Sequence, residues 1–353
     1  MNTKLSLQNP GRESPVFGGR VGSTVISTID RKRIFIFVAI AYGLCIAPYL
    51  VIFLGGGPFS SYRNAAAPQA GILRALLMFA PMIAHIATRL ITREGWSNTF
   101  LRPDLRRGRW RYYLAAWFLP FVATAMGGAV YYLLFPGHFD PSMSDYRGLG
   151  GVTSLGSGMV PWLFLITQVG IAIVQPWTEA LLLSFGEEFG WRAYLLPKLM
   201  PLGPRKAVVL VGAIWAVWHW PSILAGFNYG VGYWGAPVVG PLLFVLVLIF
   251  SSAFYAWVTL RSGSVWPAAL GHGAINVSNR LVWIFFSGEP NPLIGPGNQG
   301  VIGSLGYAVL ALLIFLGPRA LAQPAPAPLD MALAENPGAL GKAADQAKLG
   351  TAS

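Results

Sequence analysis

Long apolar runs, separated by short polar loops, make up the chain from Ile34 to Gly317. Most of them are about as long as the ~20 residues that a helix needs to cross the hydrocarbon core of a bilayer. The pattern predicts eight spans, at about residues 34–54, 71–91, 112–135, 160–184 (continuing to about 196), 207–226, 238–260, 265–286 and 301–317. We therefore expect an all-α, polytopic membrane protein, a helical bundle with flexible tails at residues 1–33 and 320–353.

The composition agrees with this class. The 353 residues are 54% hydrophobic and only 11% charged, whereas soluble domains carry about 25% charged residues. Cys45 is the only cysteine, which excludes an intrachain disulfide and a cysteine zinc cluster.

Basic residues follow a topological pattern. If the N-terminus is cytoplasmic, the cytoplasmic segments carry Arg31, Lys32, Arg33, Arg93, Arg102, Arg106, Arg107, Arg109, Arg111, Lys198, Arg205, Lys206, Arg261 and Arg319. The opposite loops offer only Arg63 and Arg147. Since cytoplasmic loops are enriched in Lys and Arg, we expect an even number of spans with both termini cytoplasmic. The net charge of +12 then reflects topology and anionic lipid headgroups rather than binding to nucleic acid.

Few polar residues interrupt the spans, and most of them fall in three segments. The stretch Ser184–Arg192 places Glu187, Glu188 and Arg192 within membrane-length apolar sequence, and His219, His272 and Asn276 lie in two later spans. Ionisable groups there are costly and mark functional sites. His85 stands alone in its span, and we interpret it as a hydrogen-bonded packing residue.

The polar residues of these three spans agree in depth. At ~1.5 Å per residue, Glu187 lies ~15 Å, His219 ~18 Å and His272 ~12 Å from the cytoplasmic end of its helix. Asn276 shares a helix face with His272, four residues earlier. Glycines beside the glutamates and His272 would let the helices approach closely. This coincidence predicts one site, entered from the cytoplasmic half of the membrane or laterally from lipid.

Structural explanations remain open for single residues. Glu188 and Arg192 are four residues apart and can form a purely structural pair. His219, between two tryptophans, can belong to an aromatic belt, and Asn276 can hydrogen-bond between helices.

The residue types allow two chemistries. A glutamate and a histidine can activate water as a general base, while a second histidine and an asparagine stabilise an oxyanion. Alternatively, Glu187, His219 and His272 make a possible set of zinc ligands, with water in the fourth position. The sequence does not decide between them, although it contains neither H-E-x-x-H nor G-x-S-x-G.

The motifs Glu187-Glu188-x-x-x-Arg192, Trp215-x-x-x-His219 and His272-x-x-x-Asn276 resemble those of the CPBP family. This family comprises CAAX prenyl endopeptidases and bacteriocin-processing (Abi) proteins. The resemblance covers about residues 161–286, and Trp215 stands where the family more often has phenylalanine.

The resemblance implies a role for each residue. Glu187 and His219 would activate water, and His272 and Asn276 would stabilise the oxyanion, or His272 would bind a metal. Glu188 and Arg192 would shape the site or orient the substrate.

The resulting hypothesis is an intramembrane endopeptidase of the inner (plasma) membrane, acting on a membrane-bound peptide or protein. Residues 160–317 would form the catalytic core and residues 34–135 an N-terminal set of helices. Eukaryotic relatives cleave prenylated CAAX proteins, but no residue here identifies a prenyl site. Two alternatives are a non-catalytic scaffold or immunity protein of the same fold and, less favoured, a transporter, because buried Glu and His also form proton relays.

Overall fold

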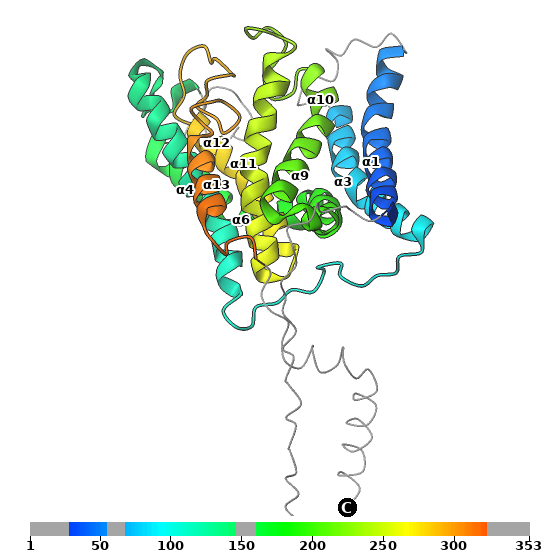
Figure 1. Cartoon of the computed structure of the whole chain (residues 1–353). Helices are drawn as coiled ribbons and strands as arrows, with labels where there is room; N and C mark the ends of the chain where they lie inside the picture. Colours follow the sequence, from blue (N-terminus) through cyan, green and yellow to red (C-terminus); the bar gives the residue numbers. More distant parts are fainter. Residues whose placement is uncertain (1–27, 55–67, 146–159, 323–353) are drawn as a thin grey trace, which may run out of the picture.

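The computed structural model describes residues 28–54, 68–145 and 160–322, and its regular elements are helices (Figure 1). In chain order the longer helices are α1 (Thr28–Leu54), α3 (Pro68–Thr92), α4 (Trp110–Leu134), α6 (Pro161–Glu179), α9 (Pro204–Trp218), α11 (Val239–Ser262), α12 (Trp266–Trp283) and α13 (Leu305–Leu316). Short elements are η1 (Pro136–His138), η2 (Ala180–Ser184), α7 (Phe185–Gly190), η3 (Trp191–Leu195), α8 (Leu196–Leu199), η4 (Met200–Leu202) and α10 (Trp220–Leu224). The predicted helical membrane fold is confirmed.

All eight predicted spans contain helix, but they differ in length. Among the described residues, four helical stretches are long and apolar enough to cross a membrane: Arg31–Val51, Trp110–Leu134, Pro161–Leu202 and Val239–Ser262. Leu76–Thr92 and Leu305–Leu316 are shorter apolar helices, so the last span begins four residues later than predicted. Residues 28–33, expected in the N-terminal tail, instead begin α1; the rest of that tail and residues 323–353 lie outside the described residues.

The predicted fifth span is interrupted at His219. Helix α9 ends at Trp218, and the His219 amide donates to the carbonyl of Ala216, three residues back. Pro221, two residues after His219, has no amide hydrogen, so a regular α-helix cannot continue through it without losing a bond. The break places His219 between two helices.

The first motif lies in an irregular part of one long helix. Two π turns, η2 and η3, flank α7, which carries Glu187 and Glu188. At the ends of these π turns, the backbone amides of Phe185 and Leu196 each donate a hydrogen bond to the carbonyl oxygen five residues earlier. Such π turns re-aim the side chains around them and are frequent at functional sites.

Glycines allow α3 to approach α7 closely. A Cβ atom on Gly186 would lie 2.6 Å from the Met78 carbonyl oxygen, and one on Gly190 would lie 2.4 Å from the Pro81 Cβ. No larger residue fits without a shift, so the predicted role of small residues around the glutamates is confirmed. The N-terminal helices thus brace the glutamate-bearing segment directly.

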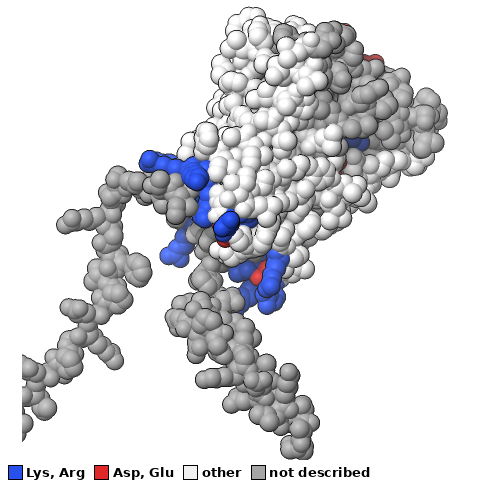
Figure 2. Space-filling model, turned by 90° about the vertical axis from the view of Figure 1, so that its right-hand side faces the viewer, with Lys and Arg blue, Asp and Glu red and all other residues white. Residues whose placement is uncertain are grey.

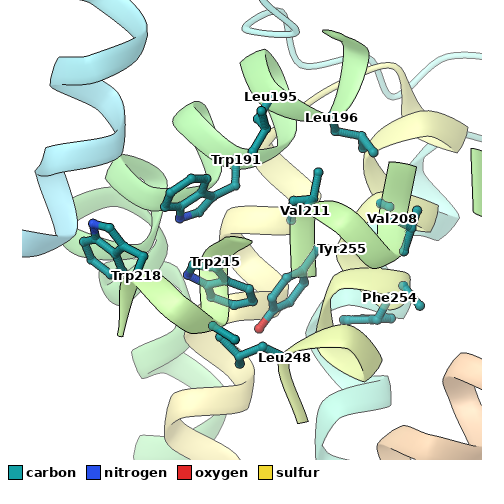
Figure 3. Packing of buried hydrophobic residues seen from close by; sticks show 14 of the residues in the cluster. Trp191, Leu195, Leu196, Val208, Val211, Trp215, Trp218, Leu248, Phe254 and Tyr255 are labelled. Atoms are coloured by element: carbon teal, nitrogen blue, oxygen red, sulfur yellow. The ribbon is translucent and has the colours of Figure 1, made fainter. Parts of the chain in front are cut away.

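Large aromatic and aliphatic side chains fill the interior where α7–α8, α9 and α11 meet (Figure 3). Many apolar side chains also face outward, for example Leu133, Leu181 and Phe35. Lys and Arg gather toward one end of the face in Figure 2, and most of that face is otherwise uncharged. An apolar exterior with charge at one end suits a bundle surrounded by lipid.

Candidate active site

A cavity of about 560 Å³ lies inside the bundle, and four predicted site residues line it. They come from three places: Glu187 from α7, His219 from the α9–α10 junction, and His272 and Asn276 from α12. The structure therefore brings together residues that are up to 89 positions apart in the sequence (Glu187 to Asn276).

Glu187 is held by Trp215. The carboxylate is 3% exposed, and its Oε2 accepts a hydrogen bond of 2.5 Å from Trp215 Nε1. No hydrogen bond to Oε1 is formed within the described part of the chain. Oε1 is therefore the carboxylate oxygen available to a reactant in the cavity.

Trp215 also orients His219. His219 Nδ1 donates to the Trp215 carbonyl oxygen at 2.9 Å, which in the neutral ring leaves the Nε2 lone pair free. The ring of His219 packs edge-on against Trp218 and Phe244. One residue thus positions both members of the predicted water-activating pair.

Glu188 and Arg192 form the predicted pair, but behind the cavity wall. Arg192 Nη1 lies 3.1 Å from Glu188 Oε1, and both side chains are fully buried. The same oxygen accepts a 2.8 Å hydrogen bond from His272 Nδ1. The pair therefore orients His272, which fits the site-shaping role that the resemblance implies.

Aromatic rings enclose the Arg192 guanidinium. Its central carbon lies 4.3 Å from the centre of the Trp215 ring and 4.7 Å from that of Tyr255, two residues that lie side by side in Figure 3. Cation–π contacts of this kind partly compensate an arginine for its lost hydration. Trp215 therefore contacts both the glutamate of the cavity and the ion pair behind it.

Asn276 has a partner that the motifs do not include. Its Nδ2 donates to Glu179 Oε1 at 3.4 Å, and Glu179 also lines the cavity. Helices α6 and α12 are close here because a Cβ on Gly273 would lie 2.7 Å from the Pro176 carbonyl oxygen. The sequence did contain a signal for Glu179, the one carboxylate within residues 160–184 and a third beside Glu187 and Glu188 in the continuation of that span to about 196.

His85 is a hydrogen-bonded packing residue, as predicted. It is fully buried; its Nδ1 donates to the Phe189 carbonyl oxygen at 2.8 Å, and its Nε2 accepts from Arg89 Nε at 2.7 Å. It joins α3 to α7 at Phe189, the residue after Glu188, and does not line the cavity.

The described side chains do not form a ready set of ligands for zinc. Across residues 28–54, 68–145 and 160–322, no three His, Cys, Asp or Glu side chains form a group that could hold a metal ion. Although Glu187, His219 and His272 share the cavity, Trp215 occupies one Glu187 oxygen and Glu188 engages His272. In the described part of the chain, these three side chains therefore do not fit a zinc site.

These features define a class: a polytopic helical membrane protein whose carboxylate, imidazole and amide groups converge on one interior cavity. Residues 161–278 match the family model of the Type II CAAX prenyl endopeptidase, Rce1-like. The predicted resemblance to the CPBP family of intramembrane proteases is therefore confirmed over this region.

The chain is also similar in sequence to a curated protein. The chain is 28% identical over 148 residues to the CAAX prenyl protease 2 of Methanococcus maripaludis, covering 41% of this chain and 49% of the relative. The chain thus spans about half the length of that relative.

Proposed function

We propose that the protein is an intramembrane endopeptidase that hydrolyses a peptide bond in a membrane-bound peptide or protein, without a covalent intermediate. The observation that carries this proposal is the convergence of Glu187, His219, His272 and Asn276 on one cavity. All four lie within the region that matches the peptidase family model.

Glu187 and His219 are suited to activate water. A water molecule between Glu187 Oε1 and His219 Nε2 would lose a proton to the carboxylate as its oxygen attacks the peptide carbonyl carbon. The carboxylic acid would then return that proton to the leaving nitrogen as the C–N bond breaks. One water is consumed, and the products are a new carboxyl group and a new amine.

His272 and Asn276 are suited to stabilise the oxyanion of the tetrahedral intermediate. Glu188 occupies His272 Nδ1, so Nε2 is the nitrogen that remains for a reactant, and it donates when the ring is protonated. Asn276 has a second amide hydrogen besides the one directed at Glu179. Removing one such donor typically costs about 10²–10³ in kcat.

Purified protein tests the proposal directly. The substrates are a panel of quenched peptides, with and without a prenyl group, presented in mixed micelles. Wild type should cleave at least one peptide, and Glu187→Gln should reduce kcat by about 10²–10⁴. Glu289→Gln, an exposed glutamate in the loop after α12, is the matched control.

Two outcomes would change the proposal. Folded wild-type protein that cleaves no peptide would favour the scaffold hypothesis. Activity that is lost on chelation and restored by zinc would favour the metal alternative, whereas the proposed chemistry predicts cleavage in the presence of chelator. We propose the plasma membrane as the location of the protein, with both termini cytoplasmic as the loop charges predict.

A further inference from the structure

We propose that Tyr255 is a further catalytic residue, whose hydroxyl donates a hydrogen bond to the reacting carbonyl oxygen of the bound peptide, beside His272. This role rests on the proposed function, and Tyr255 belongs to none of the three sequence motifs. Its place on α11, its hydroxyl and the packing of its ring each support the role.

Helix α11 lines the cavity with one stripe of side chains. The stripe consists of Phe244, Val247, Leu248, Ser251 and Tyr255, which recur at the intervals of three and four residues that define one helix face. Ser251 directs its hydroxyl to the Val247 carbonyl oxygen of its own helix, at 3.1 Å. Tyr255 therefore carries the polar group that this stripe can offer to a reactant.

The hydroxyl of Tyr255 has no protein partner in the described part of the chain, although the residue is only 1% exposed. Tyr255 lines the cavity, and Figure 3 shows its oxygen directed toward Leu248, which lines the cavity too. Buried hydroxyls usually have a hydrogen-bond partner, because removing them from water without one costs free energy. A hydroxyl that lines this cavity without a protein partner is therefore available to a ligand.

The ring of Tyr255 is fixed by its neighbours. The Arg192 guanidinium carbon lies 4.7 Å from the ring centre, and the His272 ring stacks on it at 5.5 Å between centres and 19° between planes. The Trp215 ring adds a contact at 5.8 Å. Rotation of the O–H bond is the freedom that remains, so the donor is in place before a charge develops on the substrate.

The stacked rings bring two donors to the same cavity. Glu188 accepts from His272 Nδ1, so Nε2 of that ring is the nitrogen left for a reactant, and the Tyr255 hydroxyl is its neighbour. The carbonyl oxygen gains negative charge as water attacks, so it accepts these hydrogen bonds more strongly in the transition state than in the bound peptide. The phenol keeps its proton throughout, and the proton transfers assigned to Glu187 are unchanged.

Tyr255→Phe tests the donor, because phenylalanine keeps the ring and removes only the hydroxyl. On a peptide that the wild type cleaves, kcat should fall about 10²-fold, as for the loss of one oxyanion donor, with little change in KM. The unfolding midpoint in mixed micelles should not fall, because the hydroxyl has no protein partner to lose.

Tyr307→Phe is the matched control. Tyr307 is also buried and also lines the cavity, but its hydroxyl lies 2.7 Å from Thr124 Oγ1 and donates to the Pro120 carbonyl oxygen at 3.0 Å. Its loss should lower the unfolding midpoint and reduce kcat by less than Tyr255→Phe does. The two tyrosines should therefore differ in opposite directions in stability and in kcat.

Two inhibitors with the sequence of the cleaved peptide locate the contact. A phosphinic analogue carries two oxygens on phosphorus in place of the tetrahedral intermediate, whereas a reduced-amide analogue (CH2–NH) has no oxygen at that position. Tyr255→Phe should raise Ki for the phosphinic analogue by about the factor lost in kcat/KM and leave Ki for the reduced amide unchanged.

Four results would overturn the role of Tyr255. Unchanged kcat in Tyr255→Phe would reject it while the proposed function stands. A rise in KM alone would place the hydroxyl on another part of the peptide. Equal weakening of both inhibitors, or of neither, would exclude contact with the reacting oxygen. Absence of any cleavage by folded wild-type protein would reject the proposed function, and the catalytic role of Tyr255 with it.

Discussion

Trp215 Nε1 donates a hydrogen bond of 2.5 Å to Glu187 Oε2, and the carbonyl oxygen of the same tryptophan accepts from His219. Trp215 thus links the two residues proposed to activate water. Phenylalanine, which the resemblance leads one to expect here, has no N–H to donate. The substitution is therefore a change in the hydrogen bonding of the site as well as in the size of a ring.

Trp215→Phe should lower kcat with little change in KM. A hydrogen bond to a charged group contributes about 1.5–3 kcal/mol, which corresponds to a loss of about 10–100-fold. The loss should appear in kcat because, in the proposed mechanism, Glu187 contacts the reacting water rather than the bound peptide. Steady-state kinetics on a cleaved peptide measure both constants.

Trp218→Phe is the matched control for that variant. Its indole is equally buried and donates to the Ala41 carbonyl oxygen at 3.0 Å, away from Glu187. An equal loss of kcat in both variants would show that bulk packing, and not the bond to Glu187, is responsible.

Replacing Glu188 should lower the stability of the protein, whereas replacing Glu187 should lower its activity. Glu188→Gln leaves the fully buried Arg192 without a counter-charge, and breaking a buried pair in this way costs about 3–5 kcal/mol of unfolding free energy. Glu187→Gln keeps an oxygen that can accept from Trp215, so it should remove activity and preserve stability. Unfolding in mixed micelles compares the two variants, and equal destabilisation would contradict the division of roles.

The sequence predicts the elements of the fold better than their interruptions. Apolar runs of membrane length predict all eight helical segments, because burial in lipid requires both length and apolarity. The π turns around α7 cannot be predicted in this way, since the apolar run continues through them; in the structure they flank the segment where α3 packs against Gly186 and Gly190. The break at His219 has a local cause, Pro221, and could have been predicted.

For the site, spacing identifies the residues and tertiary contacts identify their partners. Motif spacing brings Glu188 and Arg192 together because both are on one helix, and the structure confirms the pair. The bond between Glu179 and Asn276 joins α6 to α12 across 97 residues, which no local pattern encodes. Trp215 is likewise recognisable as a hydrogen-bond donor only once α9 is packed against α7.

Glu179 should act through Asn276. If the carboxylate orients the amide, Glu179→Ala should reduce kcat in the wild-type background and have no further effect in Asn276→Ala. Contacting residues usually show coupling of about 0.5–3 kcal/mol in such double-mutant cycles. Strictly additive losses would contradict a positioning role for Glu179.

Glu94, just after α3, should make stability depend on pH. Burial alone would raise the pKa of this carboxyl group, but the hydrogen bond and charge of Lys198, with Arg89 and Tyr194, hold the pKa below its ordinary value of 4.5. Because the folded state favours the ionised form, the stabilisation is fully present above the unfolded pKa. It is lost as pH falls below that value and through the lowered folded pKa. The unfolding midpoint should therefore drop between pH 6 and pH 3 by more in wild type than in Glu94→Gln, which cannot titrate. Equal pH dependence in the two proteins would assign the acid sensitivity to other carboxylates.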